Sequence, residues 1–108
     1  MKDSRVVFVH PNRRFNVEDA RSFGRLVFLF ENQRGIDHMN PGMVLRRLQE
    51  ALDREDFDPE NDFVAVTGSS VLLSLLMVVL GRRYGKIRLL IWDHRTESYV
   101  HRNAVPAA

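Results

Sequence analysis

The sequence predicts a small, Rossmann-like α/β protein with one mostly parallel sheet of four or five strands. The expected order is strand, short helix, strand, helix, strand, helix, strand, strand, and the last strand is an antiparallel edge strand. Short apolar runs alternate with stretches of helical periodicity, which is typical of this class. Residues 62–93 show a buried strand, a turn, an apolar helix, a glycine stop and a second buried strand, which together predict a βαβ unit. A length of 108 residues supports one core.

Composition excludes several classes of function. Hydrophobic residues make up 44% of the chain and charged residues 28%, as in ordinary globular domains. The chain has no cysteine, so disulfides and thiolate metal sites are excluded. A net charge of +2 does not favour nucleic-acid binding. The apolar run at 71–80 is about half of what a bilayer span needs, and the first residues lack a signal-peptide core, so we expect a cytoplasmic protein without a membrane segment.

Two strands and two helices are expected in the first half of the chain. The strands are residues 6–9 and 25–31; the second is apolar almost throughout, which is typical of a central strand with both faces covered. A brief helix over 17–23 lies between them. His38 lies in a polar loop without an evident partner. An Asn-Pro pair at 40–41 then starts a longer helix with one apolar stripe, formed by Met43, Val44, Leu45, Leu48, Ala51 and Leu52.

The second half begins with the acidic segment 55–62. Its alternating carboxylates are similar to a calcium-binding loop, but the required glycine and closing glutamate are missing, so we expect a solvated loop. Strands at 63–67 and 87–92 flank a helix over 71–80, which Gly85 ends. Because that helix is apolar on nearly every face, it is either central or covered by another subunit.

The chain is expected to end with a turn at 93–97, an edge strand at 98–102 and a flexible tail at 103–108, so that 1–102 form the domain. Two substantial helices cannot cover both faces of such a sheet. Apolar strand surface should therefore remain exposed, and a homodimer is the simplest way to bury it.

The candidate ligand site follows from the rule that ligands of open parallel sheets bind beyond the carboxyl ends of the strands. Its centre is the turn at 67–70, where a glycine admits an anion and the first N–H groups of a helix favour phosphate. A plain serine cap gives the same sequence pattern. The candidate ligand-binding residues are Asn12, Arg13, Arg34, Thr67, Gly68, Ser69, Ser70, Asp93 and His94.

A second cluster joins Asp93 and His94 with Glu31 and His10, residue types that bind divalent metals or transfer protons. The segment that starts at Asp93 is also typical of a hairpin turn. The chain has no P-loop, GxGxxG or GxSxG motif. We therefore assign no catalytic residue, metal ligand or cofactor, and favour a protein that is not an enzyme.

The segments FGRLVFLFEN, NPGMVLRRLQEAL and DFVAVTGSSVLLSLLMVVLGRRYGKIRLLIWD, with the ending ESYV, cover most of the chain. In this order they resemble small α/β proteins of bacteriophages and mobile elements. No activity is known for that group, so the resemblance supplies no functional residues. It implies an accessory protein encoded by a phage or a mobile element.

Three functions are most compatible with these observations, and nucleic-acid binding ranks fourth behind them. The favoured one is a non-enzymatic accessory protein that binds a phosphorylated, nucleotide-like small molecule at the strand ends. The first alternative is a homo-oligomeric interaction module that regulates or inhibits a host protein. The second is a metal-dependent phosphodiesterase that uses Glu31, Asp93 and His94.

Overall fold

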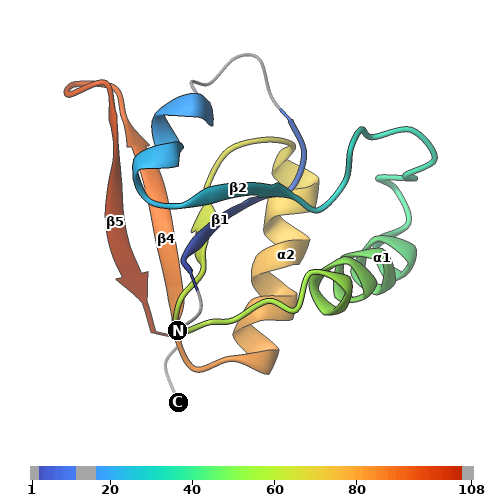
Figure 1. Cartoon of the computed structure of the whole chain (residues 1–108). Helices are drawn as coiled ribbons and strands as arrows, with labels where there is room; N and C mark the ends of the chain where they lie inside the picture. Colours follow the sequence, from blue (N-terminus) through green and yellow to red (C-terminus); the bar gives the residue numbers. More distant parts are fainter. Residues whose placement is uncertain (1–2, 12–16, 106–108) are drawn as a thin grey trace.

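A computed structural model of the chain describes residues 3–11 and 17–105. In this part of the chain one five-stranded sheet has the order β2-β1-β3-β4-β5; the first four strands are parallel and β5 is antiparallel to β4 (Figure 1). The predicted α/β class, mostly parallel sheet and antiparallel edge are confirmed. The order differs from the 3-2-1-4-5-6 order of the dinucleotide-binding Rossmann sheet, so a Rossmann-like character is not confirmed. The elements are β1 (Arg5–Phe8), η1 (Val17–Ser22), β2 (Arg25–Phe28), α1 (Pro41–Arg54), β3 (Phe63–Ala65), α2 (Ser70–Arg83), β4 (Ile87–Asp93) and β5 (Ser98–Ala104).

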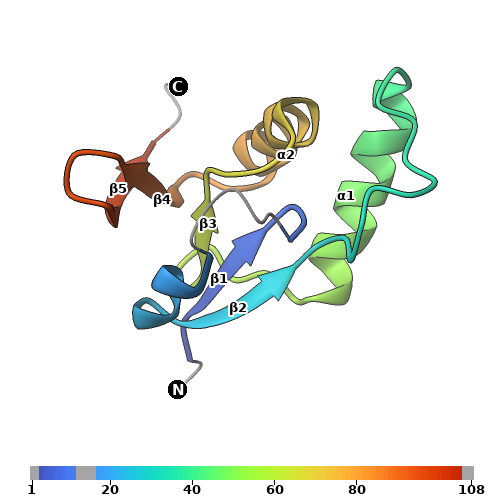
Figure 2. The ribbon, with the colours of Figure 1, turned by 90° about the horizontal axis from the view of Figure 1, so that it is seen from above.

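The helices lie on opposite faces of the sheet, with α1 and α2 on one side and the short helix η1 on the other (Figure 2). The connections from β2 to β3 and from β3 to β4 run in the same direction across the sheet, so right-handed crossovers place α1 and α2 on one face. The connection from β1 to β2 runs the other way. Two buried apolar clusters follow, a large one beneath α1 and α2 and a smaller one beneath η1.

The prediction that the second strand is central was wrong, because β2 lies at the edge of the sheet. Its two faces are nevertheless covered. Val27 and Leu29 belong to the cluster beneath α1, whereas Leu26 and Phe28 pack in the cluster beneath η1. A continuous apolar run therefore reports burial on both faces and not the position of a strand in the sheet.

Both long helices begin where the sequence predicts. Asn40 Oδ1 accepts a hydrogen bond from Met43 N–H at 3.2 Å, and Pro41 is the first residue of α1. Ser69 caps α2. That helix ends at Arg83, and Tyr84, in extended conformation with φ −132°, ends it in place of Gly85.

The last strand is longer than predicted. Asn103 and Ala104, assigned to the tail by the sequence, pair with Arg88 and Ile87 of β4. The antiparallel ladder thereby covers all seven residues of β4, because the hairpin turn leaves both arms the same length. Residues 106–108 of the predicted tail lie outside the described residues.

The acidic segment is not uniformly solvated as predicted, because Asp62 is completely buried. Arg5 donates to both of its carboxylate oxygens, from Nη2 at 2.8 Å and from Nε at 3.2 Å. Asp58 N–H donates to the same carboxylate at 2.8 Å. The hydrogen bond with Asp62 raises the pKa of the Arg5 guanidinium above its ordinary value. This pair anchors the start of β1 to the loop that precedes β3.

Candidate functional site

The carboxyl ends of the parallel strands meet at one edge of the sheet, in the order β2, β1, β3, β4. The loop after β1 leads toward β2, whereas the loop after β3 leads toward β4, so the direction of the connections reverses between these two strands. Open α/β sheets bind ligands at such a reversal. The predicted site residues that follow β3 therefore lie at this point, His10 lies there at the end of β1, and the loop after β2 lies beside it.

His10 bridges the reversal between β1 and β3. Its Nδ1 lies 2.8 Å from the carbonyl oxygen of Pro11, which can only accept, so Nδ1 carries a proton. Its Nε2 accepts the backbone N–H of Ser69 at 2.9 Å and is 3.3 Å from the side-chain amide nitrogen of Gln33. The ring is 6% exposed. A neutral, buried imidazole thus accepts the backbone N–H of Ser69, in the turn after β3.

Gln33 extends this contact to a second histidine. Its side-chain oxygen lies 2.8 Å from His38 Nε2, which donates to it. The sequence analysis found no partner for His38, but this residue is the outer end of what we call the His10–Gln33–His38 network. The network ties the loop after β2 to the turn between β3 and α2.

Close packing explains the glycine of the predicted phosphate turn. Gly68 has φ +115°, and a Cβ atom there would lie 2.7 Å from Val9 Cγ2 and 3.0 Å from His10 Nε2. Ser69 Oγ accepts the N–H of Leu72 at 3.4 Å, so this side chain acts as the helix cap. Ser70 is exposed. The capping interpretation of the turn is therefore correct, and the N–H of Ser69 is already bound by His10.

Thr67 lies beside Tyr99, which belongs to the cluster beneath η1. Thr67 is 2% exposed, and its hydroxyl and that of Tyr99 are buried without a hydrogen-bond partner among the described residues. Burial raises the pKa of Tyr99, the charge of Asp19 raises it further, and the nearby Thr67 side chain lowers it by less. Thr67 therefore belongs to the core beneath η1.

Asp93 and His94 lie at the β4–β5 hairpin. Asp93 Oδ1 accepts the backbone N–H of Arg95 at 3.0 Å, the contact of an aspartate-stabilised turn, and His94 is exposed. In the part of the chain that the structure describes, no hydrogen bond or ion pair joins them to Glu31 or His10. Within the described residues, no three histidine or carboxylate side chains gather closely enough to hold a metal ion.

A polar pocket of about 520 Å³ opens at the carboxyl end of β2. The predicted site residue Arg34 lines it together with Arg47 and Arg54 of α1, so we call it the arginine pocket. The Arg47 guanidinium lies 5.8 Å from the centre of the Phe30 ring, and Arg54 Nη2 donates to the Leu29 carbonyl at 2.9 Å. The other lining residues are Phe28, Glu31, Asn32 and Glu55.

The structure thus brings only part of the predicted site together. Gly68 and Ser69 contact His10, and Arg34 lies on the loop that holds Gln33. Asn12 and Arg13 lie outside the described residues. The sequence missed Arg47 and Arg54, although their spacing of seven residues on one helix puts them on the same side.

The fold and this edge define a small α/β protein with a polar site at the ends of its parallel strands. Residues 5–106 match the model of the phage Pam3 gp32-like protein family, and the chain belongs to that family. The predicted resemblance to small phage proteins is confirmed. No curated protein and no solved structure matches the chain. Among the described residues, no helix has the length and apolar character needed to cross a bilayer.

Proposed function

We propose that this phage-family protein is a non-catalytic binding protein that holds a small phosphorylated molecule in the arginine pocket. The observation that carries the proposal is the gathering of Arg34, Arg47 and Arg54 around one pocket at the carboxyl ends of the strands. The volume of about 520 Å³ lies within the usual range for small-molecule sites. Guanidinium groups bind phosphate through paired hydrogen bonds.

The arginines are held in place before a ligand arrives. Stacking on Phe30 positions Arg47, and the bond to the Leu29 carbonyl positions Arg54. The backbone N–H of Arg34 donates to Asn32 Oδ1 at 2.8 Å, and this hydrogen bond fixes the loop that carries Arg34. A site with positioned side chains loses less conformational entropy on binding.

Two carboxylates limit which phosphorylated molecules fit. Glu55 lies 3.6 Å from Arg54 Nε, and Glu31 also lines the pocket. Their negative charges repel a polyphosphate chain, whereas their carboxylate oxygens can accept hydrogen bonds from hydroxyl or amino groups. The pocket therefore favours a monophosphate with a polar body, such as a nucleoside monophosphate.

Thermal unfolding with AMP, ATP and inorganic phosphate as probes tests the proposal. A ligand that binds only the folded state raises the melting temperature. We expect AMP to stabilise the wild type, and Arg34→Ala and Arg47→Ala to remove that stabilisation. Arg46→Ala is the matched control, because Arg46 is exposed on the same helix and does not line the pocket. Unchanged melting with all three probes, or equal loss in the control, would contradict the proposal.

A further inference from the structure

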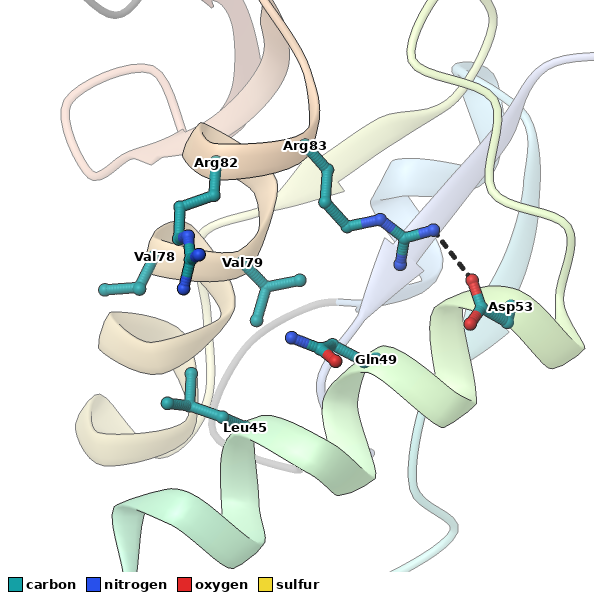
Figure 3. A pocket seen from close by; sticks show the side chains of 7 residues that line it. All are labelled: Leu45, Gln49, Asp53, Val78, Val79, Arg82 and Arg83. Carbon is teal, nitrogen blue, oxygen red and sulfur yellow. Dashed lines mark hydrogen bonds and ion pairs between the residues drawn. The ribbon is translucent and has the colours of Figure 1, made fainter.

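A groove between α1 and α2 lies away from the arginine pocket. It contains two hollows, of about 350 and 400 Å³. Leu45, Gln49, Val78 and Arg82 line the first, shown in Figure 3, while Met39, Pro41, Val71 and Leu75 line the second. Both hollows include α2, one toward each of its ends. We call this surface the α1–α2 groove.

The α2 side of the groove is an exposed apolar stripe. Val71, Leu75 and Val78 follow one another at four- and three-residue spacing and therefore share one side of the helix. Val71 is 37% exposed and Val78 48%, and Met39 beside the helix start is 89% exposed. The outer side of a helix is normally polar, so this stripe is suited to contact with another protein surface.

The two ends of the groove carry opposite charges. Arg82 lies near the end of α2, and Asp37 precedes Met39 at the other end, where its Oδ1 accepts the Met39 N–H at 3.0 Å. Both side chains are exposed and, within the described residues, neither has an ion-pair partner. The neighbouring Arg83 instead bonds Asp53 at 2.8 Å (Figure 3). The groove therefore has Arg82, an arginine without an ion-pair partner among the described residues, at one end, and Asp37 in the loop beside its other end.

We propose that this protein forms a two-fold symmetric dimer in which the α2 helices of two copies pack antiparallel along the α1–α2 groove. A two-fold axis between Leu75 and Val78 places these residues opposite Val78 and Leu75 of the second copy. The aliphatic stem of Arg82 then covers Val71 of the other copy, and its guanidinium reaches the loop that carries Asp37. Opposite helix ends lie side by side, which suits their dipoles. This arrangement buries the apolar stripe of each copy against that of the other and pairs each Arg82 with an Asp37.

Light scattering and native mass spectrometry over a wide concentration range test the dimer. We expect the wild type to dimerise reversibly. Val78→Glu places an unpaired charge at the centre of the interface. Arg82→Glu places a second negative charge beside Asp37 of the other copy. Each variant is expected to raise the dimer dissociation constant at least roughly tenfold. The double variant Arg82→Glu/Asp37→Arg restores the charge pair and should return the dissociation constant to within about threefold of the wild type.

Arg46→Glu is the matched control, since it makes the same charge change on an exposed arginine outside both hollows. It should leave dimerisation unchanged. Circular dichroism checks that each variant is folded. Val78→Glu and Arg82→Glu alter only exposed side chains, so both should fold. A monomer at every concentration, a dimer indifferent to Val78→Glu, or a double variant no better than Arg82→Glu would overturn the proposal.

Discussion

The two ends of the parallel strands are built from different polar chemistry. At the amino end, Arg5 and Asp62 form a charged pair that is closed off from solvent, since their side chains are 9% and 0% exposed. At the carboxyl end, the His10–Gln33–His38 network consists of hydrogen bonds between two histidine rings and an amide, contains no ion pair with a carboxylate, and runs from the core to the surface. The first arrangement fixes the chain, whereas the second leaves polar groups accessible beside the arginine pocket. This contrast assigns structural anchoring to the amino end of the sheet, and the ligand binding that we propose belongs to the carboxyl end.

The largest effect is expected when the anchor at the amino end is broken. Asp62→Ala leaves the Arg5 guanidinium buried without its carboxylate, which costs about 3–5 kcal/mol of folding free energy in comparable buried pairs. Urea unfolding followed by circular dichroism measures this change. The expected result is a large shift of the midpoint with an unchanged slope.

Asp53→Ala is the control for this comparison. Asp53 also bonds an arginine, at 2.8 Å, but its side chain is 64% exposed, so losing it should cost at most about 1 kcal/mol. If the two variants lost equal stability, the amino end would not be the anchor that its burial indicates.

An intermediate effect is expected at the carboxyl end from Gly68→Ala. The added methyl group would press on Val9 and His10, and the backbone would keep φ +115°, so we expect a loss of about 1–3 kcal/mol. Thermal unfolding measures it. Gly81→Ala within α2 is the matched control, because nothing lies within 4 Å of its added Cβ and alanine favours helix, so it should stabilise by about 0.5–1 kcal/mol. A neutral Gly68→Ala variant would show that His10 does not pack closely on the turn.

The smallest effect is expected from Tyr99→Phe. Tyr99 belongs to the cluster beneath η1, on the face of the sheet opposite α1 and α2. The buried hydroxyl has no partner among the described residues, so its removal should change stability at neutral pH by less than about 1 kcal/mol. The difference emerges in alkali. Because folding raises the pKa of Tyr99, the unfolded chain loses this proton first.

Wild-type stability is therefore unaffected by this group below the unfolded-state pKa of about 10 and falls as the pH rises from there through the folded-state value. Tyr99→Phe should remove this part of the alkaline loss. Urea unfolding of both proteins at neutral and at strongly alkaline pH measures it. Parallel stability curves for the two proteins would contradict the assigned burial of Tyr99.

Local sequence signals predicted most of the fold. Alternating apolar runs, the caps at Asn40 and Ser69 and the hairpin after Asp93 depend on residues close together in the chain, and each gave the correct element. Strand order depends on distant contacts, so the edge position of β2 could not be seen. Asp62 was placed in a solvated loop for the same reason, since its partner Arg5 is 57 residues away.

The site was predicted less completely. The turn around Gly68 was identified from its sequence, but no local sequence pattern indicates that His10 accepts the backbone N–H of Ser69. Arg47 and Arg54 belong to the polar side of an amphipathic helix, where exposed arginines are ordinary. Only the path of the loop after β2, which brings Arg34 against α1, makes them part of a pocket.

The inner position of β1 also has a consequence for how the chain folds. This strand is made before the other four strands of the sheet, yet it pairs on both sides, with β2 and with β3. The β4–β5 hairpin joins neighbouring segments and closes rapidly, whereas the pairing of Val6 with Phe63 must close a long loop and is slower. During synthesis, one edge of β1 therefore stays open until the segment that carries Asp62 and β3 has been made. The Arg5–Asp62 pair forms only when that edge closes, so substitutions there should act on the slow step of folding as well as on final stability.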